Sequence, residues 1–225
     1  DYTGDQTTAA NFLKVLRGED MGGKKTLKST ANDNVFVYFT DHGGPGIVAF
    51  PVGPYLYVKD LTDTLKTMYD KKMFKNLVFY MEACEAGSMF DGHLPTTQNT
   101  YAVTATNPHQ SSYACDYNAD YKAYLNDCWS RNYLNDTRWA MTNKKMDSRT
   151  HEEQYQWVKI QTTQSPECRY GNVDIAKFTL DQFQGQPSND IPRQVPTTAG
   201  KIGTPQRDVP LRLLERALEA ENDYA

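Results

Sequence analysis

The sequence has no run of apolar residues near the roughly 18 that a membrane-spanning helix needs, and its mean hydropathy is low, at −0.71. It also lacks an excess of basic residues, since its formal net charge is −4. Nucleic-acid-binding domains carry concentrated positive charge. We therefore expect neither a membrane span nor a nucleic-acid partner. The chain has no initiator methionine and no signal-like start, so we expect the natural protein to begin upstream of Asp1.

Cysteine is also scarce, with four residues and no CxxC pair. This number is too small for a disulfide scaffold, and the spacing argues against a structural zinc site, so we expect no metal and no cofactor. Cys115 and Cys128 lie 13 residues apart. They could close a loop in an oxidising compartment, and two unpaired, half-buried thiols are the equally open alternative. One glycosylation sequon, at Asn135, matters only if the chain is secreted.

The apolar pattern predicts a parallel sheet. Three β-rich runs, over 35–39, 77–81 and 101–106, have apolar residues on both faces, as parallel strands covered by helices do. Residues 60–74 carry an amphipathic helical stripe, with Asp60 as the expected N-cap. A strand, a helix and a second strand at this spacing form a βαβ unit with a right-handed crossover. The predicted class is therefore α/β.

The remaining elements are shorter and less regular. Thr150 and Glu153 form a capping box that predicts a helix through about residue 161, with His151 as a solvated side chain in its first turn. We also expect a helix over 7–17 capped by Thr7, brief paired strands over 47–50 and 55–58, loop over 113–140, a strand or short helix over 175–183, a proline-rich linker over 185–210 and a helix over 211–220.

Two reactive side chains follow two of the predicted strands. His42 lies in a glycine-rich turn after the strand at 35–39, and Cys84 follows the strand at 77–81. Reactive groups collect at the carboxyl ends of parallel strands, and a Cys/His pair there suits nucleophilic attack on a carbonyl. A structural cysteine and a turn histidine are the alternative. Glu82 and Glu85 flank the cysteine, and negative charge disfavours its thiolate.

The residues around these positions resemble a known family. YFTDHGGPG (residues 38–46) is similar to the block around the catalytic histidine of the legumains, also called asparaginyl endopeptidases or vacuolar processing enzymes, and FYMEACEAGSM (79–89) to the block around their nucleophilic cysteine. The likeness continues from end to end, through DYTGD, VKDL, NPHQSSYAC, YLND, EQYQWVK and QFQG.

This resemblance implies a caspase-like, three-layer α/β fold with a mainly parallel sheet flanked by helices. It implies Cys84 as nucleophile, His42 as general acid and base, and Gly43 and Cys84 as donors of the oxyanion-hole amides. The implied activity is cleavage of protein or peptide substrates after asparagine, less readily after aspartate. Peptide ligation, activation by self-cleavage at acidic pH, inhibition by cystatin-type proteins, and a lysosomal, vacuolar or secreted location are further family properties. Glu82, Ser112 and Asp127 match family positions in the pocket for the asparagine side chain.

The chain departs from the family pattern in two places. Family members begin with about one more strand, which carries an asparagine behind the catalytic histidine and the basic residues of the pocket, and we expect this first strand to be missing here. Cys128 stands where the family more often has a hydrophobic residue, and a Cys115–Cys128 disulfide would stiffen the loop of Asp127.

The end of the chain resembles the family's inhibitory activation peptide, with Asn222 at the place of self-cleavage. We therefore divide the chain into a peptidase domain lacking its N-terminal portion (1–184), a linker (185–210) and the start of an activation peptide (211–225). Two alternatives remain. One is the catalytic subunit of a glycosylphosphatidylinositol transamidase, which shares the His-Gly and Cys pattern. The other is a catalytically inactive legumain homologue that serves as a binding protein.

Overall fold

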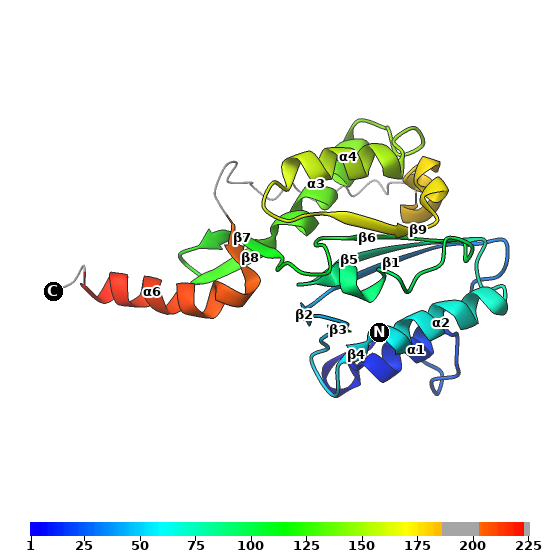
Figure 1. Cartoon of the computed structure of the whole chain (residues 1–225), viewed down its shortest axis with the longest axis horizontal. Helices are drawn as coiled ribbons and strands as arrows, with labels where there is room; N and C mark the ends of the chain where they lie inside the picture. Colours follow the sequence, from blue (N-terminus) through cyan, green and yellow to red (C-terminus); the bar gives the residue numbers. More distant parts are fainter. Residues whose placement is uncertain (186–202, 223–225) are drawn as a thin grey trace.

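A computed structural model of the protein describes residues 1–185 and 203–222. A four-stranded sheet lies at its centre (Figure 1), with strand order β1-β5-β6-β9. β1, β5 and β6 are parallel, and β9 pairs antiparallel with β6. The α/β class with a mainly parallel sheet is therefore confirmed. The strands are β1 (Asn34–Thr40), β5 (Asn76–Glu82), β6 (Thr100–Thr104) and β9 (Cys168–Gly171).

Helices cover both faces of this sheet and complete three layers. Figure 1 shows α1 (Ala9–Leu16) and α2 (Val58–Asp70) on one face, and α3 (Cys128–Thr142) and α4 (His151–Gln161) on the other. All seven residues of β5 are buried. Successive side chains of a strand point to opposite faces, so Phe79 packs in the α1–α2 layer and Tyr80 packs in the α3–α4 layer. Each fully buried side chain of this size contributes about 1.5–3 kcal/mol.

The helix boundaries follow local signals, with two corrections. The capping box of Thr150 and Glu153 is present, as predicted. Thr8, rather than Thr7, caps α1 by accepting a hydrogen bond from the Asn11 N–H. α2 begins at Val58, so Asp60 lies in its first turn instead of capping it. A carboxylate in that turn still interacts favourably with the helix dipole.

His151 is not solvated, and here the prediction was wrong. The side chain is completely buried, and its Nδ1 lies 2.8 Å from the Tyr80 hydroxyl. Burial disfavours the charged imidazolium and lowers the pKa of His151 to about 3. The first turn of α4 faces the sheet, which the position in the capping box alone does not reveal.

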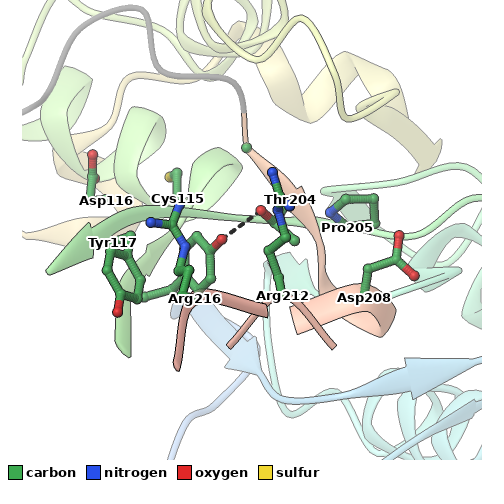
Figure 2. Close-up of a pocket in the computed structure, with 10 residues that line it drawn as sticks. Cys115, Asp116, Tyr117, Thr204, Pro205, Asp208, Arg212 and Arg216 are labelled. Carbon is green, nitrogen blue, oxygen red and sulfur yellow. Dashed lines mark hydrogen bonds between the residues drawn. The ribbon is translucent and has the colours of Figure 1, made fainter. Parts of the chain in front are cut away.

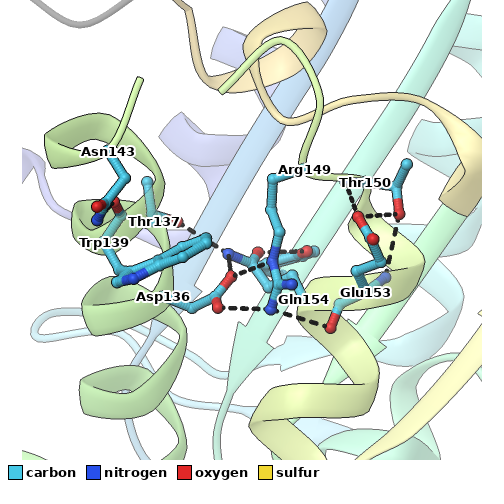
Figure 3. A network of polar contacts seen from close by, with 9 residues as sticks. Asp136, Thr137, Trp139, Asn143, Arg149, Thr150, Glu153 and Gln154 are labelled. Carbon is cyan, nitrogen blue, oxygen red and sulfur yellow. Dashed lines mark hydrogen bonds and ion pairs between the residues drawn. The ribbon is translucent and has the colours of Figure 1, made fainter. Parts of the chain in front are cut away.

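Residues 113–140 form two strands and a helix rather than the predicted loop. β7 (Tyr113–Asn118) and β8 (Ala123–Asp127) are an antiparallel pair, and α3 begins directly after them. The inner face of α3 includes polar residues such as Asn132 and Asp136, which hides the apolar period. Hydrogen bonds across to α4 satisfy these residues. Figure 3 shows Asp136 of α3 beside Arg149 and Gln154.

The shorter segments connect this body to the site. β2 (Gly43–Gly44), β3 (Ile47–Val48) and β4 (Leu56–Tyr57) form a small antiparallel sheet, which confirms the predicted pairing. Between 173 and 184 the chain forms a 3₁₀ helix (Val173–Lys177) and α5 (Asp181–Gln184), so the short-helix alternative is correct.

The C-terminal segment is more ordered at its end than the linker prediction implied. β10 (Thr204–Pro205) pairs antiparallel with β7, and α6 (Val209–Asn222) begins two residues earlier than expected. In Figure 1, α6 extends away from the three layers on the side of β7 and β8. Most of the predicted linker, residues 186–202, lies outside the described residues.

Candidate active site

The parallel register brings the two predicted catalytic loops to one edge of the sheet. Phe39 pairs with Met81 and Thr40 pairs with Glu82. His42 and Cys84 each follow two residues after the last aligned pair, so both leave the sheet at the same level. The Asp41 N–H donates to the Glu82 carbonyl at 3.2 Å and continues the pairing past the end of β1.

The turn that carries His42 packs directly against the backbone of Cys84. A Cβ on Gly43 would lie 2.4 Å from the Cys84 carbonyl oxygen and 2.9 Å from the Ala83 Cβ, which no other residue could tolerate. The Ser88 hydroxyl, in the turn after the cysteine, accepts a hydrogen bond from the Gly46 N–H at 2.8 Å. These contacts hold the two loops together, with the His42 side chain exposed.

Cys84 sits in a sharp turn at the end of β5, and its side chain is only 3% exposed. Its Sγ lies 3.0 Å from the Ser111 Oγ and 3.6 Å from the Ser112 Oγ. The next residue, Glu85, has a left-handed backbone with φ of 48°, a conformation that is uncommon outside glycine and that concentrates at functional sites. The turn ends the strand abruptly and presents the sulfur at the rim of the sheet.

Glu82 and Asp127 form a buried pair of carboxylates next to this turn. Glu82 Oε2 accepts hydrogen bonds from the Ser130 N–H and hydroxyl, both at 2.9 Å. Within the described residues, Glu82 Oε1 is buried and has no hydrogen-bond partner. Burial, and then the Asp127 charge, raise the pKa of Glu82 well above its usual value. Burial also raises the pKa of Asp127, while a hydrogen bond from Gln206 and the nearby His42 oppose this rise.

An unpaired buried acceptor is costly. It marks a place where a ligand with N–H donors would be stabilised. Two ionised carboxylates offer only acceptors, so this position suits a neutral, donating group such as a carboxamide.

The chain itself places a carboxamide beside Asp127. We call residues 203–208 the strap. Its strand β10 pairs with β7, and the Gln206 N–H donates to the Ser112 carbonyl at 2.9 Å. The Gln206 side-chain amide donates to Asp127 Oδ1. The strap therefore lies along β7 as an added strand with one amide side chain on Asp127, which is how an extended peptide binds at a sheet edge.

The sequence matches the peptidase C13 family over residues 1–186. The chain belongs to the peptidase C13 family. Legumain from Bos taurus is 44% identical over 229 residues, which cover 99% of this chain and 52% of the bovine protein. The vacuolar-processing enzyme from Vicia sativa is 38% identical over 234 residues, which cover 94% of this chain and 47% of the plant protein. The chain thus spans about half the length of the curated relatives it matches.

A search of solved structures finds the crystal structure of caspase-1 from Spodoptera frugiperda, with a TM-score of 0.46 and 13% sequence identity. The match covers 72% of this chain and 67% of that chain. This likeness is too distant to carry an argument about the site, and the assignment to the C13 family does not depend on it.

One contact beside Cys84 was missed in the sequence. The sequence gives Glu85 no firm role beyond a structural one, yet its side chain is 3% exposed and its Oε2 lies 2.5 Å from Arg207 Nη2 of the strap. Burial raises the pKa of Glu85, and the Arg207 charge opposes this. No local pattern could have revealed this ion pair, because Arg207 lies 122 positions later in a stretch whose composition indicates a linker.

The remaining predicted site residues lie on β7, α3 and α6. Asn135 is half-buried within α3, where its side-chain oxygen accepts a hydrogen bond from Arg138 at 3.3 Å. Asn222 is the last residue of α6. Cys115 and Cys128 are both buried and both free thiols. Glycosylation and self-cleavage at the two asparagines stay predictions.

The described residues do not show the features of two other functional classes. Among residues 1–185 and 203–222, no group of three or more histidine, cysteine or acidic side chains is arranged to hold a metal ion. Over the same part of the chain, no helix is both long enough and apolar enough to cross a membrane.

Proposed function

We propose that this chain carries the catalytic centre of a cysteine endopeptidase that cleaves peptide bonds after asparagine. The contact between the His42–Gly43 turn and the Cys84 backbone carries the proposal, because it assembles a thiol and an imidazole at the carboxyl edge of a parallel sheet. Membership of the C13 family, and the names legumain and vacuolar-processing enzyme among its relatives, support the same chemistry.

The proposed reaction uses these groups in turn. The Cys84 sulfur attacks the carbonyl carbon of the scissile bond as His42 takes the thiol proton. The N–H groups of Gly43 and Cys84 stabilise the oxyanion. His42 then returns its proton to the leaving amine, which leaves a thioester on Cys84. Water, deprotonated by His42, hydrolyses the thioester, and an amine at the same step would give ligation instead.

The carboxylate pocket accounts for the choice of asparagine. A side-chain amide of the substrate would donate to Asp127 and to the unpaired oxygen of Glu82. Gln206 supports this because it already makes the Asp127 contact with an amide, although its side chain is one methylene longer. Aspartate has no N–H to donate and repels both carboxylates when ionised. Aspartate is therefore the poorer residue before the scissile bond, and the rate of cleavage after aspartate rises most when acid neutralises the pocket carboxylates.

The strap adds self-inhibition to this proposal. With Gln206 in the pocket and the backbone of the strap paired to β7, substrate has no free site. Acid would protonate Glu85 and Asp127, whose pKa values are raised by burial, and so weaken the contacts that these two carboxylates make with Arg207 and Gln206 of the strap. Cleavage after Asn222 would then cut the chain at the end of α6, and the strap would stay joined to the peptidase domain. We place such an enzyme in a lysosome, a vacuole or the secreted fluid, with protein substrates and cystatin-type inhibitors as partners.

The test uses the full-length natural protein, activated by acid, and a fluorogenic peptide with asparagine before the scissile bond. We expect hydrolysis by the wild type, none above background by Cys84→Ala, and at least about 100-fold slower hydrolysis of the glutamine analogue. Equal rates for the wild type and Cys84→Ala would contradict catalysis by Cys84. The alternative of a catalytically inactive homologue that serves as a binding protein would then be favoured. Equal cleavage rates for peptides with different residues before the scissile bond would contradict the asparagine specificity but not the peptidase activity.

A further inference from the structure

Ser130 connects the pocket carboxylate of Glu82 to the start of α3. Its N–H and its hydroxyl both donate to Glu82 Oε2, each at 2.9 Å. Ser130 is the third residue of α3. The first N–H groups of a helix have no partner within the helix, and the side chain of the N-cap residue usually accepts from the N–H at this third position. Glu82 therefore caps α3 from a different element, β5.

This contact releases Asp127 from the role that its position would give it. Asp127 is the N-cap residue of α3, yet its side chain makes no capping hydrogen bond. It accepts the Gln206 amide instead. The two carboxylates thus divide the work at the start of α3, because Glu82 closes the helix end and Asp127 is left to bind an amide. Glu82 also gains from the partial positive charge at the helix N-terminus.

Tyr38 fixes the direction of the Ser130 hydroxyl. The Tyr38 hydroxyl donates to Ser130 Oγ at 2.8 Å, and Ser130 Oγ donates to Glu82 Oε2. A serine hydroxyl carries one proton, so accepting from Tyr38 leaves that proton for Glu82. The Tyr38 ring packs edge-on against Tyr133, one turn further along α3, with ring centres 5.2 Å apart. This chain of hydrogen bonds therefore joins β1, α3 and β5.

The groups around Glu82 act in both directions on its charge. Burial raises the pKa of Glu82, the charge of Asp127 raises it further, and the two hydrogen bonds from Ser130 lower it. The titratable groups that face Glu82 come from β1, β8 and α3, and they are Tyr38, Asp127, Cys128 and Tyr133. Because Oε2 already accepts twice, a proton on Glu82 would go to Oε1, which would then no longer accept along that direction. Ser130 thus favours the ionised form, in which both oxygens accept.

The strap leaves the Glu82 side of the pocket unused. Figure 2 shows Thr204, two residues before Gln206, beside β7. The Thr204 hydroxyl lies 2.7 Å from that of Tyr124 on β8, and Gln206 then reaches Asp127. Within the described part of the chain, no donor reaches Glu82 Oε1. This oxygen is therefore available to a group that the chain itself does not supply.

We propose that Ser130 and Tyr38 are positioning residues of the asparagine pocket, which act on the substrate through Glu82. Tyr38 orients the Ser130 hydroxyl, and Ser130 holds Oε2 against the end of α3. Oε1 is thereby left to accept an N–H of the asparagine amide. This inference rests on the proposed function and adds two residues that set its specificity.

The test compares Ser130→Ala with the wild type in the full-length protein, activated by acid, on the fluorogenic asparagine peptide. The substitution keeps the backbone contact with Glu82 and removes only the hydroxyl. We expect KM to rise about tenfold with kcat within about twofold, because the amide contact is made in the ground state and in the transition state alike. The acid-side fall of kcat/KM should begin about one pH unit higher, since losing a hydrogen bond to a carboxylate raises its pKa.

Three further variants separate positioning from packing. Ser130→Thr restores the hydroxyl and should bring KM back to within about threefold of the wild type. Tyr38→Phe removes only the group that orients Ser130 and should raise KM about threefold. Thr162→Val is the matched control, because this buried hydroxyl also accepts from one side chain, Asn132, and donates onward, to the Val158 carbonyl. Its loss should leave KM and the pH profile unchanged.

A measurement without turnover separates this inference from the proposed function. In the Cys84→Ala protein, infrared spectra at a series of pH values follow the carboxyl band that Glu82→Gln removes. Ser130→Ala should move the protonation of that carboxyl up by about one pH unit. Tyr38→Phe should move it in the same direction by less. It keeps the test valid if Ser130→Ala folds poorly, because Tyr38 is 37% exposed.

The possible results differ for the two proposals. Equal rates for the wild type and Cys84→Ala would refute the proposed function, and the pocket assignment with it. Cleavage after asparagine with an unmoved Glu82 titration in Ser130→Ala would overturn this inference alone. A rise in KM without that shift, or an equal rise in Thr162→Val, would also overturn it, because a merely structural role gives the same loss.

Discussion

Two buried carboxylates of this protein differ in how completely they are satisfied. Asp136, on α3, receives a hydrogen bond from Arg149 at 2.8 Å on one oxygen, and bonds from Arg149 and Gln154 on the other, as Figure 3 shows. Glu82, at the end of β5, has Ser130 on one oxygen and, among the described residues, nothing on the other. Both side chains are almost completely buried.

The difference separates a structural charge from a binding one. A buried carboxylate is tolerated in a fold when a cation and hydrogen bonds compensate it, and Asp136 meets that condition within the α3–α4 layer. Glu82 faces a second carboxylate, Asp127, and no cation that would compensate it is among the causes of its pKa shift. An incomplete set of partners costs stability, and the site recovers that cost when a donating ligand binds. Changes at Asp136, Glu82 and the strap, and the pH dependence of stability, test this difference.

The largest effect is expected from Asp136→Asn. The substitution keeps the shape but leaves Arg149 without its counter-charge, and Arg149 is mostly buried, with an exposed fraction of 18%. We expect a loss of about 3 kcal/mol in the free energy of unfolding, at the lower end for a broken buried pair. Urea unfolding of the full-length protein measures it, and the kcat/KM of the folded fraction should stay within about twofold. A stability loss below about 1 kcal/mol would mean that Asp136 contributes no more than Glu82 to the free energy of unfolding.

The matched change in the pocket, Glu82→Gln, should have the opposite profile. The new amide puts a donor where the substrate's donor must lie, so kcat/KM for asparagine peptides should fall about 30-fold or more, equivalent to about 2 kcal/mol. Stability at neutral pH should not fall, because a buried charge is removed. Steady-state kinetics and urea unfolding on the same sample test both statements. Unchanged preference for asparagine over glutamine would remove Glu82 from the pocket.

The pH dependence of stability should follow the uncompensated carboxylates. Burial raises the pKa of Glu167 to about 8, and the pKa values of Glu82 and Asp127 are also raised. A raised pKa in the folded state gives stability that is present below the unfolded pKa and lost as pH rises through the folded pKa. Each group changes stability by at most about 1.4 kcal/mol per pH unit within that window.

His151 contributes the opposite pH dependence of stability. Its pKa is lowered to about 3 in the folded protein, so stability is lost as pH falls below about 6.5. Several carboxylates oppose one histidine, so we expect the protein to lose stability between about pH 5 and pH 8. Thermal melting across this range measures the net effect, and Glu82→Gln should flatten the curve. A protein more stable at pH 8 than at pH 5 would contradict the assignment of uncompensated carboxylates.

The smallest effect is expected from Arg207→Gln. Its ion pair with Glu85 is half exposed on the arginine side, with an exposed fraction of 56%, and such pairs contribute about 1 kcal/mol or less. We expect the unprocessed protein to show up to about fivefold more activity at neutral pH. Gln206→Ala, which removes the amide on Asp127, should release more activity than Arg207→Gln. The reverse order would mean that the ion pair, rather than the pocket amide, holds the strap.

Much of the fold could be predicted from local pattern. The buried strands over β1, β5 and β6 and the capping box of α4 all follow short-range rules, because apolar period and capping act over a few residues. The prediction of loop over 113–140 was wrong for a related reason. The inner face of α3 carries Asn132 and Asp136, and these count as polar until their partners in other elements are known.

The amino-acid sequence alone specifies the chemistry of the site: a thiol and an imidazole, each after a buried strand and each beside a glycine turn, with acidic residues next to the thiol. How these groups meet depends on the folded chain. The parallel register aligns His42 with Cys84, and the strap brings Gln206 and Arg207 to Asp127 and Glu85. Hydrogen bonds and ion pairs act over a few ångströms in space. Partners far apart in the chain therefore become visible only once it is folded.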